Sequence, residues 1–356
     1  MDAKQKLLEY VEFIDKKLDE YWKEELAIGF GFNEKQKALV IKMLEHSREH
    51  NLRPAKRLRG SFVNYGFILG GEKADERVCR AAMAVEIVHT ALLMMDDVMD
   101  QDNLRRGKPT THKFFEGEDG DGHYGESMAY STSIAILTIG YQLMLDSGFD
   151  NEKAKKVSDK FLRGVANTAY GQAYDVNLEK IKDDWGEDDV MVLHKAKTAI
   201  YTYENPLFVG AILAGLEGKV YEILHDYSMD GGVAFQLQDD ILGVYGDPEK
   251  TGKSADSDLL QGKCTLLVIK LLKDGTPEQI KALNSVWGKR TASREAIDLA
   301  KQAIIESGSL EYSRKISKEY AARAAKIAEK LRELNLNKEA IDYIQGIAEY
   351  MVNRDV

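Results

Sequence analysis

Proline is scarce along this chain, and its scarcity limits the fold more than any other feature. Only five prolines occur in 356 residues, at positions 54, 109, 206, 248 and 277. Proline breaks helices because it lacks an N–H group and clashes with the preceding turn. The long segments without proline are rich in Ala, Leu, Lys and Glu, which are good helix formers. The chain is therefore predicted to be all-helical.

Apolar residues recur at three- and four-residue steps through these segments, as they do in amphipathic helices. Leu7, Val11, Ile14 and Leu18 form such a stripe in the segment 3–26. We predict further helices at 35–50, 75–101, 127–146, 151–176, 188–215, 231–246, 264–273, 277–286, 292–306, 310–334 and 338–353, with one more opened by the segment 53–60. The segment 75–101 is apolar on most faces and is expected at the centre of a bundle. Length alone suggests about two domains, but no linker divides the chain, so we expect one domain over 1–356.

Charge and composition exclude several classes of protein. The chain has 49 basic and 59 acidic residues, a net charge of −10, which argues against non-specific binding of nucleic acid. No run of ~18 apolar residues occurs, so no membrane span is predicted. The charged N-terminal segment does not resemble a signal peptide. Two cysteines, Cys79 and Cys264, suggest no disulfide framework, so we expect a cytoplasmic protein.

An acidic motif follows the central apolar segment, in the stretch MMDDVMDQDNLRRG. On a helix Asp96 and Asp100 lie one turn apart on the same face, with Asp97 beside them. A solvated acidic helix end is the alternative interpretation. Carboxylates at the edge of an apolar pocket repel one another, however, and a bound cation removes that repulsion. Oxygen ligands without a Cys or His cluster favour Mg²⁺ over zinc.

A second acidic pair, Asp239 and Asp240, ends another apolar segment. Two such motifs suggest the opposed walls of a metal–diphosphate site, because Mg²⁺ usually binds through one or two carboxylates together with substrate phosphates. Arginine and lysine are the side chains that bind phosphate groups. The candidates are Lys56, Arg57, Arg59, Arg105, Arg106, Lys197, Lys253 and Lys263, although each could be an ordinary surface cation.

Six segments in order resemble the isoprenyl (polyprenyl) diphosphate synthase family, over nearly the whole chain. KRLRG, DDVMDQDNLRRGKPTTH, GQAYD, KTAIYTYENPL, FQLQDDILGVYGDPEKTGK with QGKCTL, and the ending IAEYMVNRD are similar to the motifs of that family. The resemblance implies a single all-α bundle of the isoprenoid synthase type around a central active-site cavity, usually as a homodimer. It also implies a Mg²⁺-dependent prenyltransferase that condenses isopentenyl diphosphate with an allylic diphosphate.

The resemblance assigns roles to individual residues. Asp96, Asp100 and Asp239 would bind three Mg²⁺ ions, and Asp97 and Asp240 belong to the same catalytic motifs. The allylic diphosphate would be held by Arg105, Lys197, Lys253 and Lys263. The diphosphate of isopentenyl diphosphate would be held by Lys56, Arg59, His89 and Arg106. Thr198, Gln172, Asp175 and Gln236 would support the site.

The second motif departs from the family pattern, because Gly243 stands where a third aspartate is usual. Product length is expected to depend on the residues before Asp96. Ala91 and Leu92 stand where enzymes that make fifteen-carbon products often have aromatic residues, and Ile87 and Val88 lie one turn deeper. We expect the growing tail to pass Ala91 and stop near Ile87 or Val88, which gives a twenty-carbon product.

Other readings remain open. A farnesyl or longer-chain diphosphate synthase shares all six motifs. A class I terpene cyclase shares the fold and the first motif but is expected to lack the cations for isopentenyl diphosphate. A non-catalytic prenyl-binding partner subunit would have lost an aspartate or the RRG arginines, and only Gly243 favours that reading.

Overall fold

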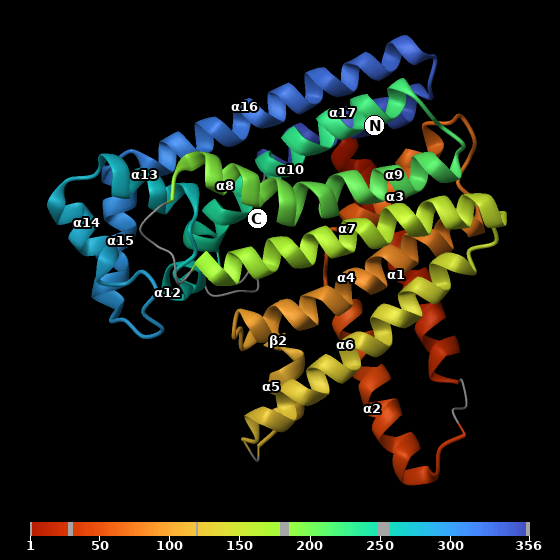
Figure 1. The fold of residues 1–356 in the computed structure, drawn as a ribbon, viewed down its shortest axis with the longest axis horizontal. Helices are drawn as coiled ribbons and strands as arrows, with labels where there is room; N and C mark the ends of the chain where they lie inside the picture. Colours follow the sequence, from red (N-terminus) through yellow and green to blue (C-terminus); the bar gives the residue numbers. More distant parts are fainter. Residues whose placement is uncertain (1, 28–30, 119, 179–184, 248–255, 354–356) are drawn as a thin grey trace. The chain divides into compact units, whose positions relative to one another are not determined.

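The computed structural model describes residues 2–27, 31–118, 120–178, 185–247 and 256–353. The described chain is helical apart from one short two-stranded hairpin, so the all-α prediction is confirmed (Figure 1). By its contacts the chain divides into two compact units. The first comprises Met1–Phe161, Pro206–Glu217 and Asn337–Tyr343, and the second Leu162–Asn205, Gly218–Leu336 and Ile344–Val356. A single domain over 1–356 stays a prediction.

The first unit is built around one helix. Its elements are α1 (Ala3–Leu26), α2 (Glu34–Asn51), α3 (Leu58–Ile68), α4 (Glu76–Met99), β1 (Leu104–Arg105), β2 (Lys108–Pro109), α5 (Thr111–Glu116), α6 (Gly122–Leu145), the beginning of α7 (Asn151–Leu178) and most of α9 (Asn205–Leu213). Helix α4 contacts α1, α2, α3, α5 and α6. Asp75 caps α4 by accepting hydrogen bonds from the backbone N–H groups of Arg77 and Val78. The prediction of a central buried helix at 75–101 is therefore confirmed.

The second unit is also built around one helix, α10 (Lys219–Tyr245). Its other elements are the larger, C-terminal part of α7, α8 (Glu187–His194), the π-helical segment η2 (Lys195–Glu204), α12 (Ser257–Gln261), α13 (Leu266–Asp274), α14 (Pro277–Asn284), α15 (Arg294–Glu306), α16 (Ser309–Glu329), the 3₁₀ segment η3 (Lys330–Leu334) and most of α17 (Lys338–Val352). Helix α10 contacts α8, η2, α12, α13, α16 and η3. Each acidic doublet thus lies near the C-terminal end of the central helix of its own unit.

Among the helices of the described residues, α4 and α6 are long and apolar enough to cross a membrane by length and composition alone. Buried core helices pass the same test, and 72% of the apolar window of α4 is buried inside the protein, against 44% for α6. This is weak evidence for a span, and the predicted absence of one stays a prediction.

Candidate active site

The hairpin after α4 turns Arg105 of the RRG segment back toward the first acidic motif, whereas Nη1 of Arg106 donates to the carbonyl of Arg53 at 3.2 Å. Its strands pair Leu104 with Pro109 and Arg105 with Lys108. Both turn residues have positive φ, 53° at Arg106 and 74° at Gly107. Turns of this kind match the right-handed twist of paired strands, and glycine adopts positive φ without strain. The glycine of the RRG segment therefore has a structural reason, which is to close this hairpin.

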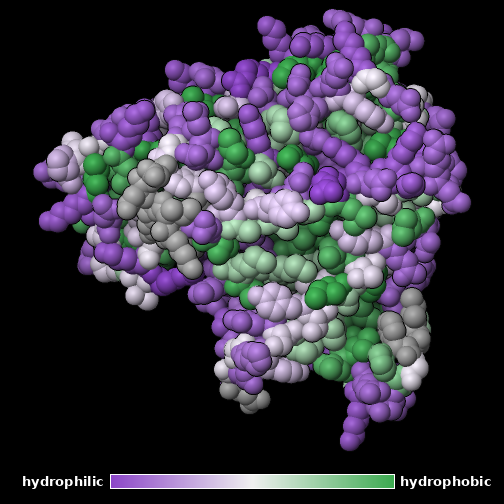
Figure 2. Space-filling model, viewed as in Figure 1, coloured by the Kyte–Doolittle hydropathy of each residue, from purple (hydrophilic) through white to green (hydrophobic). Residues whose placement is uncertain are grey.

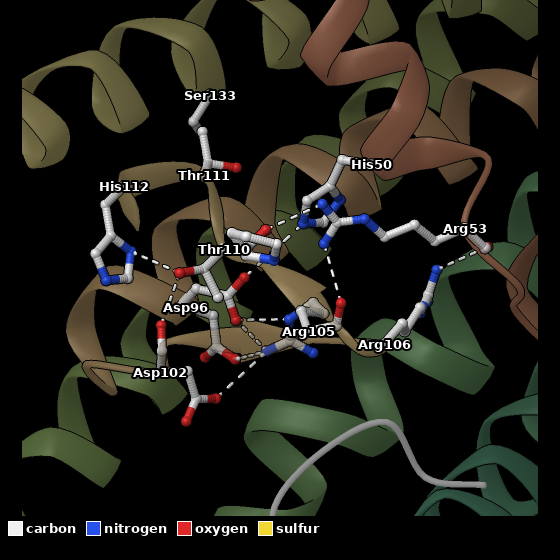
Figure 3. A network of polar contacts seen from close by, with 12 residues as sticks. His50, Arg53, Asp96, Asp102, Arg105, Arg106, Thr110, Thr111, His112 and Ser133 are labelled. Atoms are coloured by element: carbon white, nitrogen blue, oxygen red, sulfur yellow. Dashed lines mark hydrogen bonds and ion pairs between the residues drawn. The ribbon is translucent and has the colours of Figure 1, made fainter. Parts of the chain in front are cut away.

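Arg105 pairs most closely with the second aspartate of the first doublet, and Figure 3 shows its ion pairs with the neighbouring Asp96 and Asp102. Its Nε lies 2.6 Å from Oδ1 of Asp97, and its Nη2 pairs with the same oxygen. The Nη2 atom also lies 3.7 Å from Asp96 and 3.8 Å from Asp102. Burial alone would raise the pKa of Asp97, but Arg105 and then His50 outweigh burial and lower it. Asp97 is therefore an ionised, fully buried carboxylate whose charge is compensated inside the protein.

A second layer of side chains holds the hairpin against α2. Nη1 of Arg53 donates to the carbonyl of Arg105, and Nη2 donates to the carbonyl of Pro109, both at 3.0 Å. Glu49 binds the guanidinium of Arg53 with both carboxylate oxygens. The buried His50 ring lies 3.9 Å from Oδ2 of Asp97. Figure 3 shows the contact between Arg53 and the carbonyl of Arg105. Together these contacts fix the position of Arg105 on the side of the hairpin that faces α2.

The exposed fractions within the first doublet differ. The side chain of Asp97 has no exposed surface, whereas that of Asp96 is 24% exposed. Asp100 is the C-cap of α4, and its backbone N–H donates to the carbonyl of Asp96 at 2.8 Å. Asp96 and Asp100 thus supply carboxylate oxygens one helical turn apart, while Asp97 serves to anchor Arg105.

The basic segment before α3 contains residues with different roles. Arg57 is buried and binds Asp15 at 2.7 Å, Glu86 at 3.3 Å and the carbonyl of Asn51 at 2.6 Å. It is a structural cation. Arg59 instead contacts Nε2 of His89 through Nη1 at 2.9 Å. The structure therefore brings together two of the four residues predicted to bind isopentenyl diphosphate.

Burial controls the charge of two residues in this group. It lowers the pKa of His89 well below its usual value, and Arg59 and Arg106 lower it further, so the ring is neutral at pH 7. Burial also lowers the pKa of Arg106 to about 10, with contributions from Arg57 and Arg105. Crowded guanidiniums repel one another, and a bound anion would relieve that repulsion.

The second doublet has the same internal division. Asp240 is buried, and its Oδ2 lies 3.1 Å from Nε2 of His194 while Oδ1 accepts from Gln236 at 2.8 Å. Gln236 in turn accepts a hydrogen bond from the Thr198 hydroxyl at 2.6 Å. Burial would raise the pKa of Asp240, but His194 and Gln236 lower it overall. Asp239, by contrast, remains partly exposed.

Lys197 and Thr198 lie in a π-helical segment, where one continuous helix over 188–215 was predicted. Close packing of small residues accompanies this irregularity. A Cβ atom on Gly232 of α10 would lie 2.3 Å from Cα of Ala199, and one on Gly171 would lie 2.9 Å from Cα of Lys197. Segments of this kind often occur at functional sites. Nζ of Lys197 pairs with Oδ2 of Asp175 at 2.7 Å.

The remaining predicted residues differ in their exposure and in their neighbours. Lys263 pairs with Asp258 at 3.3 Å, Lys56 is exposed, and Lys253 lies outside the described residues. Ile87, Val88 and Ala91 are fully buried on α4 and Leu92 is half-buried. Helix α6 approaches closely here, since a Cβ on Gly140 would lie 2.7 Å from Cγ2 of Val88.

Sequence reasoning missed the residues that hold the buried aspartates. His50, Arg53 and His194 lie outside or between the recognised motifs, and no spacing links them to Asp97 or Asp240. Their roles arise from contacts between helices, which a helical periodicity cannot specify.

A search of the described residues finds no group of three or more His, Cys, Asp or Glu side chains placed to hold a metal ion. The partly exposed Asp96 and the adjacent Asp100 nevertheless offer only oxygen donors. Such a donor set fits Mg²⁺, which keeps several waters and commonly completes its coordination with substrate phosphates.

Comparisons with known proteins identify the family. The polyprenyl synthetase family matches residues 41–304. The geranylgeranyl diphosphate synthase of Saccharolobus solfataricus is 33% identical over 303 residues, 84% of this chain and 86% of the relative. The geranylfarnesyl diphosphate synthase of Aeropyrum pernix is 32% identical over 81% of this chain and 86% of its own. A Corynebacterium glutamicum geranylgeranyl pyrophosphate synthase, solved with isoprenyl diphosphate and magnesium, superposes with a TM-score of 0.88 at 27% identity, covering 99% of this chain and 100% of its own. This chain belongs to the polyprenyl synthetase family and is a prenyltransferase.

Proposed function

We propose that this prenyltransferase condenses isopentenyl diphosphate with an allylic diphosphate in a Mg²⁺-dependent reaction and releases geranylgeranyl diphosphate. The observation that carries the proposal is the split within each acidic doublet. Asp97 and Asp240 are buried and held by Arg105 and His194, whereas Asp96 and Asp239 keep exposed surface. Arg105 and His194 would orient the doublets, and the partly exposed first carboxylate of each doublet would bind a metal.

Asp96, Asp100 and Asp239 are the proposed ligands of three Mg²⁺ ions. Bound Mg²⁺ would draw electron density from the C1–O bond of the allylic diphosphate. Lys197, held by Asp175, and Lys263, held by Asp258, would bind that diphosphate, together with Lys253. Arg105 is engaged with Asp97, so it orients the motif, and its direct contact with diphosphate stays a prediction.

The proposed reaction exchanges one bond for another. The C1–O bond of the allylic substrate breaks, and both bonding electrons leave with the diphosphate. The double bond of isopentenyl diphosphate then attacks C1, and the departing diphosphate accepts the proton that is lost. Arg59, Arg106 and Lys56 would hold the second diphosphate, with neutral His89 ordered by Arg59.

The twenty-carbon product is proposed from the residues that precede Asp96. Ala91 presents no ring, and Ile87 and Val88 are large, fully buried side chains one turn deeper. Among the relatives, one is a geranylgeranyl and another a geranylfarnesyl diphosphate synthase at nearly equal identity, so a twenty-five-carbon product is the competing outcome.

The test is an incubation with Mg²⁺, isopentenyl diphosphate and each of the five-, ten- and fifteen-carbon allylic starters. Products are dephosphorylated and sized by mass spectrometry. We expect one twenty-carbon product that disappears with EDTA. A fifteen- or twenty-five-carbon product would overturn the chain length alone. No elongation by folded protein that binds pyrophosphate would indicate a non-catalytic subunit, and loss of diphosphate without isopentenyl diphosphate would indicate a cyclase.

We also propose that a second copy of this chain covers the outer face of α6, which makes the enzyme a homodimer. No charged residue occurs between Ser127 and Leu145, yet Tyr130, Ile134 and Leu145 are 40%, 58% and 54% exposed. Figure 2 shows pale and green surface where α6 crosses the view. A chain with a net charge of −10 repels its copy least across an uncharged face.

The oligomer is tested by light scattering after size-exclusion chromatography. Ile134→Glu is expected to give a monomer, while Leu299→Glu, on the 63% exposed Leu299 of α15, is the matched control and leaves the dimer intact. Wild-type protein that elutes as a monomer would contradict the proposal. Binding of wild type to lipid vesicles that is lost in Ile134→Glu would instead assign the face to a membrane surface.

A further inference from the structure

The loop between α2 and α3, residues 52–57, lies beside three of the four residues predicted to bind isopentenyl diphosphate. Lys56 belongs to the loop, and Arg59 belongs to the first turn of α3 that follows it. Arg106 donates through Nη1 to the carbonyl of Arg53, near the start of the loop, at 3.2 Å. The position of this loop therefore affects three cations at once.

Arg57 leads the chain from the loop into α3 in a conformation that is rare for a residue other than glycine. It is the N-cap of α3, with φ 48° and ψ 32° in the left-handed region. Its side chain is 2% exposed. The guanidinium binds Asp15 of α1 at 2.7 Å, the carbonyl of Asn51 of α2 at 2.6 Å and Glu86 of α4 at 3.3 Å. Contacts with three helices thus hold a turn that the backbone alone disfavours.

Glu86 is a buried carboxylate in the middle of α4, 3% exposed. Its Oε2 accepts from Nη1 of Arg57, and its Oε1 accepts from the backbone N–H of Gly60 at 2.8 Å. Gly60 is the third residue of α3, and the N–H groups of a first turn have no partner within their own helix. The first backbone bond of α3 runs from Ser61 to the carbonyl of Arg57 at 3.0 Å. Glu86 therefore caps α3 from another helix while it holds Arg57.

The same face of α4 meets Arg59. Glu86 and His89 are three residues apart and share a face of the helix, and Nε2 of His89 lies 2.9 Å from Nη1 of Arg59. Residue 59 lies between the two residues that Glu86 holds. A shift of the first turn of α3 would therefore move Arg59 relative to His89.

Glu86 also balances the charge of this group of arginines. Burial, Arg57 and Arg105 lower the pKa of Arg106, whereas Glu86 acts on that pKa in the opposite direction. A buried carboxylate among guanidiniums keeps them charged, and charged guanidiniums are the groups that bind phosphate oxygens.

We propose that Glu86 is a positioning residue for isopentenyl diphosphate, which holds the turn at Arg57 and the first turn of α3 so that Arg59 meets both His89 and the substrate. The binding of that substrate by Arg59 rests on the proposed function, whereas the contacts of Glu86 do not. Glu86 acts through Arg57 and Gly60 and does not itself contact the diphosphate.

The positioning role is tested by steady-state kinetics of Glu86→Gln with each substrate varied in turn. Glutamine keeps the size and one oxygen acceptor but lacks the charge that pairs with Arg57. We expect the KM for isopentenyl diphosphate to rise about tenfold, the usual size of effect for a residue that orients a ligand-binding side chain. The KM for the allylic starter should change little. Glu76→Gln, on the exposed Glu76 at the start of the same helix, is the matched control and should keep both values.

A purely structural role would give a different pattern. Glu86→Gln would then lower the unfolding midpoint and leave the KM for isopentenyl diphosphate unchanged, and that result would overturn the proposal.

The hydrogen bond from Gly60 is tested by comparing Gly60→Pro with Gly60→Ala. Proline removes the N–H, and the first turn of a helix tolerates it because no intrahelical bond is lost there. Alanine keeps the N–H and controls for added atoms, since a Cβ on Gly60 would lie 3.0 Å from the Tyr10 hydroxyl and 3.3 Å from Cγ of Glu86. We expect Gly60→Pro to have the lower unfolding midpoint and the higher KM for isopentenyl diphosphate. Both differences should shrink when residue 86 is alanine, and differences of the same size in both backgrounds would overturn the role of this bond.

Failure of the proposed function would be seen separately. Wild type that elongates no allylic starter would contradict that function, while the unfolding midpoints of the variants at 60 and 86 would still decide whether Glu86 holds the first turn of α3.

Discussion

The C-terminal ends of α4 and α10 each hold a buried aspartate, but the partner of that aspartate comes from a different part of the chain in each case. Each carries an acidic doublet whose second aspartate is buried and whose first keeps exposed surface. In α4 the buried partner is Arg105, delivered by a hairpin that follows directly in sequence. In α10 the buried partner is His194, which belongs to α8, more than forty residues earlier in the chain.

The largest effect is expected where a buried charge loses its partner. Asp97→Asn removes the nearest carboxylate from the buried guanidinium of Arg105 and leaves it only Asp96 and Asp102, at 3.7 and 3.8 Å. Removing one partner of a buried ion pair costs about 3–5 kcal/mol of unfolding free energy. Asp240→Asn should cost less, because histidine can release its proton and arginine cannot. Urea denaturation measures both, with exposed Asp226→Asn as the control. Equal losses of unfolding free energy in Asp97→Asn and Asp240→Asn would contradict the expected difference between the two doublets.

Lys197 pairs with the partly exposed Asp175, whereas Arg105 pairs with the fully buried Asp97. A variant of Lys197 is therefore expected to affect activity more than stability. Lys197→Gln should lower kcat/KM about 10²-fold, the cost of removing a group that stabilises developing negative charge. Stability should change little, because the Lys197–Asp175 pair is partly exposed. Exposed Lys195 lies in the same segment, and Lys195→Gln should keep full activity. If the role of Lys197 were purely structural, Lys197→Gln would lower the stability of the protein more than it lowers kcat/KM.

Close packing beside the two central helices predicts a smaller, graded effect. Gly232→Ala would press on the Cα of Ala199, and Gly140→Ala would press on a side-chain methyl of Val88. Overpacking costs about 1–3 kcal/mol, and the backbone contact should cost more because it cannot rotate away. Gly122→Ala has open space around it and is the control. Thermal unfolding that ranks Gly140→Ala as the worse variant would contradict this reading.

The smallest effect concerns the second layer behind Arg105. Burial raises the pKa of Glu49, but hydrogen bonds from Arg53 and Lys108 outweigh it and lower the pKa to about 2. A depressed carboxyl pKa contributes stability above its unfolded value of about 4.3, and that stability is lost as pH falls through the folded pKa. Because the side chain of Glu49 is 37% exposed, solvent screens its ion pairs and the contribution should stay below about 1 kcal/mol.

The measurement is the difference in unfolding free energy between wild type and Glu49→Gln as a function of pH. The difference should be constant near neutral pH and shrink toward zero as the medium becomes acidic. A difference that grows with acid would have the wrong sign for a depressed pKa.

The apolar periodicity and the order of the motifs predicted most of the helices. The segments 3–26, 35–50 and 75–101 match α1, α2 and α4 within one or two residues, because apolar spacing and caps such as Asp75 are local. The hairpin at Leu104–Pro109, helix α5 and the π-helical segment were missed. Their geometry depends on contacts with distant helices, such as Arg53 with the hairpin carbonyls.

The candidate site was predictable only as far as residue type. The resemblance assigned the metal to Asp96, Asp100 and Asp239, but it gave Asp97 and Asp240 no role beyond membership of the same catalytic motifs. Which member is buried depends on the helix face toward α2 or α8, and no sequence signal placed His50 or His194 there.

The central claim is that within each doublet the first aspartate serves the metal and the second serves the fold. The most direct measurement is calorimetric binding of Mg²⁺–pyrophosphate to Asp96→Asn, Asp97→Asn, Asp239→Asn and Asp240→Asn, each with its unfolding midpoint. We predict that the Asp96 and Asp239 variants lose affinity with midpoints near wild type, and that the other two lose stability first. Loss of affinity at unchanged stability in Asp97→Asn and Asp240→Asn would contradict the claim.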